Sequence, residues 1–202
     1  MRGGGATETA RRPGGDVIPY SGVTSLQGHF LIAAHTLVDP NFFRSIVLMV
    51  QHNEQGALGL ILNRITRTTV AEVCEKLLEE TPGSIEGNVR QGGPCEGPLM
   101  ILHNEEAAGD LEVISGVQFS TDRQKIEWLL RQHEGPAGVF IGYAGWSAGQ
   151  LEEELKGNSW LVLPATAGEV FDPSLNWQRM LTRAFLAQYI PVDQIPTDPR
   201  AN

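Results

Sequence analysis

Residues 139–155 read Val-Phe-Ile-Gly-Tyr-Ala-Gly-Trp-Ser-Ala-Gly-Gln-Leu-Glu-Glu-Glu-Leu, and this stretch decides how the fold is organised. The apolar run Val139–Tyr143 is typical of a β-strand. Leu151 and Leu155 lie one helical turn apart, so they share one face of a helix. The glycines between the two runs permit a sharp turn. The stretch therefore predicts a strand, a glycine-rich elbow and a helix.

The elbow contains the pattern Gly-x-Ser-x-Gly, with Ser147 in the position of the nucleophile of α/β-hydrolases. In that fold a histidine that follows the serine takes its proton, but all five histidines of this chain precede Ser147. Ser147 and Gln150 also match a capping box, in which Ser147 is the N-cap of the next helix. We therefore assign no catalytic residue, and a small serine hydrolase that uses Ser147 is the alternative.

Short apolar runs bounded by glycine, proline or polar residues predict the remaining strands. The expected strands are Phe30–Ala34, Ile46–Val50, Leu58–Leu62, Val89–Gln91, Leu99–Leu102, Leu111–Ser115 and Ser159–Leu163. The polar loop 52–56 contains a glycine and favours an antiparallel hairpin. Capping boxes at Thr69 with Glu72 and at Thr121 with Gln124 begin two helices, and another helix spans about 175–189. The fold class is α+β, with a mixed, mainly antiparallel sheet and about four helices.

The length of 202 residues fits a single compact domain. Because the first residues lack a hydrophobic period, we expect a disordered tail at 1–25, a folded domain at 26–190 and a C-terminal tail at 191–202. No signal-peptide pattern and no apolar run of about 18 residues occurs. The two cysteines lack the spacing of a zinc or redox site. We expect a cytoplasmic protein that has no cofactor and does not associate with a membrane.

The formal net charge of −9 is unfavourable for a surface that neutralises phosphates. Basic residues such as Arg64, Arg67, Arg123 and Arg131 stand singly, and no helix-turn-helix pattern is recognisable. We expect no direct contact with nucleic acid. The expected partner is an unknown small molecule or protein.

Two of the expected strands end in the same tripeptide, His-Asn-Glu, at residues 52–54 and 103–105. If these strand ends lay side by side, His52 and His103 together with one glutamate would resemble a two-histidine, one-carboxylate metal site. Neither copy has the i, i+4 helical spacing of a persuasive metal motif. We assign no metal, and a site at His52 and His103 is the alternative.

Four sequence blocks occur in a fixed order: Gly28–Ala33 with Asp39–Phe42, His52–Arg64, Gly92–Pro94 and Gly142–Leu155. Together they resemble the AlgH or YqgE family of small bacterial proteins, over about residues 26–172. The resemblance implies a compact α+β fold with an intertwined mixed sheet. It supplies no mechanism, because the activity of the family is undetermined, although members are sometimes labelled transcriptional regulators. In the family the position of Ser147 can also be glycine, which favours the structural interpretation.

Many specific polar and glycine residues stand at the ends of the expected strands, but they form no complete catalytic set. We therefore expect a noncatalytic binding or accessory protein whose ligand or partner meets a surface near the elbow and the hairpin. The candidate binding residues are Asp39, Asn41, His52, Asn63, Arg64, Trp146 and Gln150.

Overall fold

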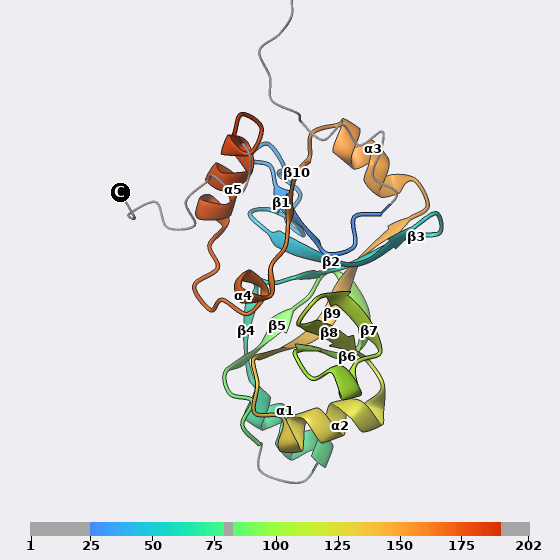
Figure 1. Cartoon of the computed structure of the whole chain (residues 1–202), viewed down its shortest axis with the longest axis vertical. Coiled ribbons are helices and arrows are strands. Elements are labelled where there is room, and N and C mark those ends of the chain that lie inside the picture. Colours follow the sequence, from blue (N-terminus) through green and yellow to red (C-terminus); the bar gives the residue numbers. More distant parts are fainter. Residues whose placement is uncertain (1–24, 79–82, 191–202) are drawn as a thin grey trace, which may run out of the picture.

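The computed structural model describes residues 25–78 and 83–190, which form one α+β domain (Figure 1). The tails expected at residues 1–25 and 191–202 lie outside the described residues, except for Ser25. Of the helices within the described ranges, none has the length and apolar character needed to cross a bilayer.

The strands are β1 (His29–Ala33), β2 (Ile46–Asn53), β3 (Gly56–Ile61), β4 (Ile65–Thr69), β5 (Asn88–Gln91), β6 (Cys95–His103), β7 (Leu111–Ile114), β8 (Val117–Ser120), β9 (Ala137–Ser147) and β10 (Trp160–Pro164). The helices are α1 (Val70–Leu78), the short 3₁₀-helix η2 (Glu106–Ala108), α2 (Arg123–Gln132), α3 (Gln150–Lys156), α4 (Ala167–Val170) and α5 (Trp177–Leu186).

The strands form one sheet in the order β10-β1-β2-β3-β9-β6-β8-β7, and β4 is joined through β5 to β9. Strand β5 runs parallel to β9, and every other pairing between the described strands is antiparallel. This arrangement confirms the mixed, mainly antiparallel sheet. In Figure 1 the upper half holds β1, β2, β3 and β10 with α3 and α5, whereas α1 and α2 cover the lower end.

Strand β9 belongs to both halves of the molecule. Its first part pairs with β6, from Ala137 opposite His103 to Tyr143 opposite Cys95. Its last residues, 144–147, pair with β3 instead. Two residues before the change of partner, Gly142 adopts a positive φ of 67°, a conformation that glycine takes without strain. The strand therefore changes its partner shortly after this glycine.

The turn between β5 and β6 presses directly against the backbone of β9 at this point. The Gly92 N–H donates to the Ile141 carbonyl at 2.8 Å. A Cβ atom on Gly92 would lie 2.3 Å from the Gly142 carbonyl oxygen, and one on Gly93 would lie 2.2 Å from the Tyr143 carbonyl carbon. Only residues without a side chain allow so close a contact between two backbones.

The upper strands are buried on both faces, as expected for continuous apolar runs. In β1, Phe30 and Ile32 enter a core that is shared with α4 and α5, whereas Leu31 and Ala33 enter a second core beneath α3. The Trp177 indole N–H donates to the Ala33 carbonyl at 2.8 Å and fixes α5 to this strand. A third core lies between the lower strands and helices α1 and α2.

Local sequence signals predicted most of these elements. The β2–β3 hairpin is present, and both strands extend further into its turn than expected. The first capping box is confirmed, since the Glu72 N–H donates to the Thr69 hydroxyl at 3.2 Å and the Glu72 carboxylate accepts from the Thr69 N–H at 2.8 Å. The elements that were not expected are β4, β8, η2 and α4.

The second capping box is wrong. The N-cap of α2 is Asp122, whose carboxylate accepts from the N–H groups of Gln124 at 3.0 Å and Lys125 at 3.1 Å. Thr121 is not the N-cap, and its N–H donates instead to the Asp110 carboxylate at 2.7 Å. The contact with Asp110, which is distant from α2 in the sequence, thus overrides the local capping pattern.

We predict that Gly93→Ala destabilises the protein by about 3 kcal/mol or more, because its methyl group would overlap the β9 backbone. Gly168→Ala is the matched control, since Gly168 lies in α4 and a Cβ atom there would have no described atom outside its own helix within 4 Å. We expect Gly168→Ala to raise the free energy of unfolding by about 0.5–1 kcal/mol. Urea unfolding followed by tryptophan fluorescence measures both. Equal stability of Gly93→Ala and the unsubstituted protein would contradict the steric argument.

Candidate functional site

The β1–β2 loop, residues 34–45, is built on a turn that begins at Asp39. The Asp39 carboxylate accepts from the Asn41 N–H at 2.7 Å. Its carbonyl accepts from the N–H groups of Phe42 at 2.9 Å and Phe43 at 2.7 Å. Asn41 is exposed to solvent. Of these two candidates, Asp39 is occupied in forming the turn, whereas the Asn41 side chain remains open to a partner.

Asn63 and Arg64, which closely follow β3, hold this loop in place. The Asn63 side chain accepts from the Ile46 N–H at 2.9 Å and donates to the Arg44 carbonyl at 2.8 Å. The Arg64 guanidinium donates to the Pro40 carbonyl at 3.0 Å. Burial lowers the pKa of Arg64 below its ordinary value, although the nearby Asp39 carboxylate opposes this shift. Two sequence blocks therefore form one structural unit.

The loop is anchored at its other side by an aromatic cluster of Phe42, Trp146 and Trp160. The Phe42 ring stacks on Trp146 at 5.9 Å between centroids and meets Trp160 edge-on at 5.4 Å. One carboxylate oxygen of Glu154 accepts from both indole N–H groups, at 2.9 Å from Trp146 and 2.8 Å from Trp160. Trp146 is buried, so it supports the loop from below and does not itself present a binding surface.

At the elbow, the expectation that Ser147 is the N-cap of α3 is wrong. Ser147 is the last residue of β9, paired with Gly56, and the N-cap is Gly149 with φ of 77° and no side-chain hydrogen bond. Pairing with β3 draws Ser147 into the sheet. The reciprocal half of the capping box is present, because the Gln150 side-chain oxygen accepts from both the N–H and the hydroxyl of Ser147, each at 3.1 Å.

His52 connects three parts of the chain near the elbow. Its Nδ1 accepts from the Leu26 N–H at 3.0 Å, so the neutral ring carries its hydrogen on Nε2. Nε2 donates to the Glu152 carboxylate in α3 at 2.9 Å. Both ring nitrogens are thus engaged within the protein, while the Ser147 hydroxyl donates to Gln150 and not to this histidine.

The structure does not bring His52 and His103 together. His103 pairs with Ala137 at the start of β9, whereas His52 pairs with Ala57, which in turn pairs with Trp146 near the end of that strand. At about 3.3 Å per residue, these positions are separated by about 30 Å along β9. Within the described residues, no three or more His, Cys, Asp or Glu side chains are grouped so as to hold a metal ion.

His103 belongs instead to a buried polar centre in the lower half. Its Nδ1 accepts from the Glu105 N–H at 3.1 Å, and its Nε2 donates to the Ser120 hydroxyl at 2.9 Å. The Ser120 hydroxyl in turn donates to the Ala108 carbonyl at 2.6 Å. Burial, and then the neighbouring His133, lower the pKa of His103 to about 4. His103 is therefore neutral at pH 7.

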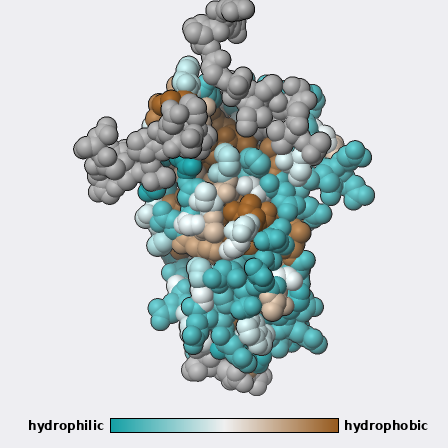
Figure 2. Space-filling model, viewed as in Figure 1, coloured by the Kyte–Doolittle hydropathy of each residue, from teal (hydrophilic) through white to brown (hydrophobic). Residues whose placement is uncertain are grey.

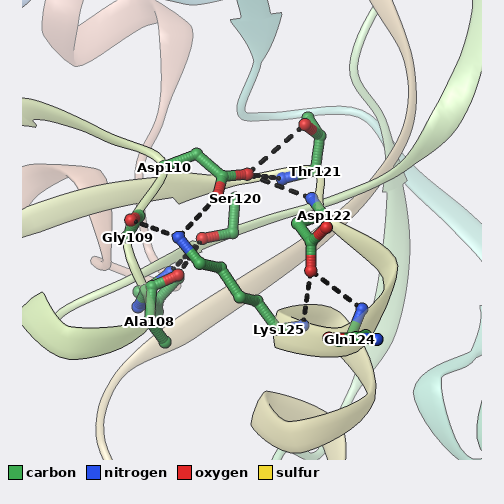
Figure 3. A network of polar contacts seen from close by, with 9 residues as sticks. Ala108, Gly109, Asp110, Ser120, Thr121, Asp122, Gln124 and Lys125 are labelled. Atoms are coloured by element: carbon green, nitrogen blue, oxygen red, sulfur yellow. Dashed lines mark hydrogen bonds and ion pairs between the residues drawn. The ribbon is translucent and has the colours of Figure 1, made fainter.

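A second set of polar contacts beside this centre fixes α2 to the sheet (Figure 3). The Lys125 ammonium donates to the Gly109 carbonyl and to the Asp110 carboxylate, both at 2.7 Å. The Asp110 carboxylate also accepts from the N–H groups of Thr121 and Asp122. Burial alone would raise the pKa of Asp110, but these hydrogen bonds lower it to about 2. The start of α2 is thus held in one position.

The AlgH-like family model matches residues 30–187. The chain belongs to the AlgH-like family. A UPF0301 protein of Thioalkalivibrio sulfidiphilus is 39% identical over 168 residues, which cover 79% of this chain and 90% of that protein. A UPF0301 protein of Xanthomonas campestris is 40% identical over 164 residues, which cover 77% and 87%. The family is one of uncharacterised function.

Solved structures of this fold agree with the architecture described above. The solution structure of the AlgH protein from Pseudomonas aeruginosa superposes with a TM-score of 0.66 at 35% identity and covers 83% of this chain and 92% of that one. The crystal structure of a Corynebacterium diphtheriae protein has a TM-score of 0.65 at 22% identity, with coverage of 83% and 89%, and shows the same fold.

The double acceptor role of Glu154 predicts that Glu154→Ala destabilises the protein by about 2–4 kcal/mol, because two indole N–H groups lose their partner. Glu153→Ala is the matched control on the same helix. Glu153 is exposed and contacts Lys156, so its removal should change the free energy of unfolding by about 0.5 kcal/mol or less. Urea denaturation compares the two. A similar loss for both variants would show that the aromatic cluster does not depend on Glu154.

The low pKa of His103 predicts that acid weakens the fold before most carboxylates begin to titrate. Between pH 6.5 and about 4 the unfolded chain binds a proton at this histidine and the folded protein does not. The free energy of unfolding should therefore fall by on the order of 2–3 kcal/mol as the pH drops through this window. His103→Gln should flatten this part of the profile, measured by urea unfolding at successive pH values. An unchanged slope in the variant would contradict a neutral, buried His103.

Proposed function

We propose that this chain is a cytoplasmic, noncatalytic binding or accessory protein, and that a protein partner docks on exposed apolar side chains of the β1–β2 loop and of the start of β4. The docking face consists of Val38, Phe43 and Ile65, which are 82%, 47% and 70% exposed. The hydrogen bond from Arg64 to the Pro40 carbonyl brings the loop next to the start of β4. Exposed large apolar side chains gathered in one region are typical of interaction sites.

The contacts behind the docking face favour binding because they hold its loop in one conformation. Asn63 and Arg64 fix the loop backbone, and Phe42 is locked among the two tryptophans. A preformed loop loses little conformational entropy when a partner binds. Asp39 and Asn41 supply polar groups at the edge of the face, which matches the polar rim of protein interfaces.

The polar contacts at the elbow support a noncatalytic role. The Ser147 hydroxyl donates to Gln150, and Gln150 in turn donates to Glu154 at 3.1 Å. The nearby His52 uses both ring nitrogens to join Leu26 and Glu152. The formal net charge of −9 supports a protein or small molecule as the partner in preference to nucleic acid. A small serine hydrolase based on Ser147 remains the alternative.

We expect a photo-crosslinking amino acid at position 43, introduced in the organism of origin, to capture a specific protein. The same amino acid at position 75, an exposed site on α1, is the control and should not capture it. The captured protein, once purified, should bind the chain in calorimetry, and Val38→Asp should weaken binding about tenfold or more. Unchanged affinity of Val38→Asp, or equal capture from position 75, would overturn the docking face.

The hydrolase alternative is tested separately with a fluorophosphonate probe on the purified protein. A noncatalytic protein should remain unlabelled, both as it stands and as Ser147→Ala. Labelling that disappears in Ser147→Ala, with unchanged circular dichroism, would establish Ser147 as a nucleophile and refute the noncatalytic proposal.

A further inference from the structure

A cavity of about 370 Å³ opens in the lower half of the molecule, between the end of β6 and the C-terminal end of α2. Its walls include Asn104, Glu105, Trp128, His133 and Glu134. Its volume is in the range of small-molecule sites. It lies next to the buried His103 centre, away from the β1–β2 loop in the upper half, so it is independent of the docking face (Figure 1).

The walls of this cavity combine an aromatic face with negative charge. Trp128 is 40% exposed, and its indole makes no hydrogen bond to the described residues. Glu105 and Glu134 add two carboxylates, and no lysine or arginine of the described residues lines the cavity. On the face viewed in Figure 2, this half of the molecule is mostly hydrophilic. An aromatic ring beside carboxylates attracts organic cations.

A histidine in the cavity wall supplies an unused acceptor. His133 is only 4% exposed, and its Nε2 makes a long contact of 3.4 Å to the Pro136 carbonyl. In the tautomer that donates this bond, Nδ1 is an acceptor, and it has no hydrogen-bond partner among the described residues. Nδ1 is not one of the fully buried side-chain atoms that lack a partner, so it reaches solvent and can accept a hydrogen bond from a donor group that binds in the cavity.

Part of the wall is closely packed around Gly135. A Cβ atom at Gly135 would lie 2.2 Å from the Asn104 side-chain oxygen and 2.9 Å from His133 Cε1, so these groups pack tightly around that glycine. The contacts of Lys125 with Gly109 and Asp110 fix the helix that carries Trp128 (Figure 3). Because His103 beneath the wall is neutral at pH 7, it places no positive charge against a cationic ligand.

We propose that this cavity binds an organic cation, an ammonium or guanidinium group, between the Trp128 ring and the carboxylates of Glu105 and Glu134. The cation stacks on the indole, its N–H groups donate to the carboxylates, and one further N–H donates to His133. The same chemistry is offered by a free polyamine and by a lysine or arginine side chain of another protein. The arms of the test distinguish these sources.

The test is NMR titration of the ¹⁵N-labelled full chain with spermidine, and separately with doubly capped arginine and lysine. The indole N–H signal of Trp128, identified by its loss in Trp128→Phe, should shift in a saturable manner. The indole signals of Trp146, Trp160 and Trp177 should stay in place. Tighter binding of spermidine indicates a free polyamine, and equal or tighter binding of a capped residue indicates a side chain of a partner.

Two variants with the same change of charge control for general attraction to an acidic protein. Glu134→Gln should weaken binding about fivefold to tenfold, because it removes one carboxylate from the cavity. Glu106→Gln, an exposed residue next to Glu105 but outside the cavity walls, should leave the affinity unchanged. The absence of a saturable shift with any of the three probes at about 10 mM, or an equal loss in both variants, would overturn the proposal.

Discussion

The whole structure depends on one contact, in which Gly92 and Gly93 pack against the backbone atoms of Gly142 and Tyr143. At this point β9 leaves β6 and joins β3, and among the described strands β9 is the one that joins the upper and lower halves of the sheet. The turn before β6 packs against β9 where β9 changes partner, and it does so too closely for a Cβ atom at Gly92 or Gly93. Two glycine-rich blocks that are far apart in the sequence are therefore the two sides of a single steric requirement.

The sequence predicts those parts of the fold that are determined by neighbouring residues. The apolar strands, the β2–β3 hairpin and the cap at Thr69 all follow from short patterns. The two wrong capping predictions arise from contacts with residues that are distant in the sequence. Ser147 belongs to β9 because Gly56 pairs with it, and Asp122 is the N-cap of α2 because Thr121 binds Asp110 instead. No local pattern contains this information.

Local sequence patterns are equally limited in predicting the roles of the candidate site residues. Asn63, Arg64 and Trp146 stand out in the sequence because they are polar or aromatic at strand ends, yet in the structure they act inward, on the loop and its aromatic support. Val38 and Phe43 of that loop belong to none of the expected strands, and the structure shows that they are 82% and 47% exposed. Trp128 lies two residues from both Ile126 and Leu130, off the buried face of α2, and its ring is 40% exposed.

The position of β9 in the chain has a consequence for the order in which the protein forms during synthesis. Strands β1 to β8 leave the ribosome before β9, but β3 and β6 are joined into one sheet only when residues 137–147 are available. The edges of β3 and β6 that β9 finally covers thus stay open while all the preceding strands emerge. Unpaired strand edges promote association between chains, and the pairing of β9 with β3 and β6 removes two such edges at once.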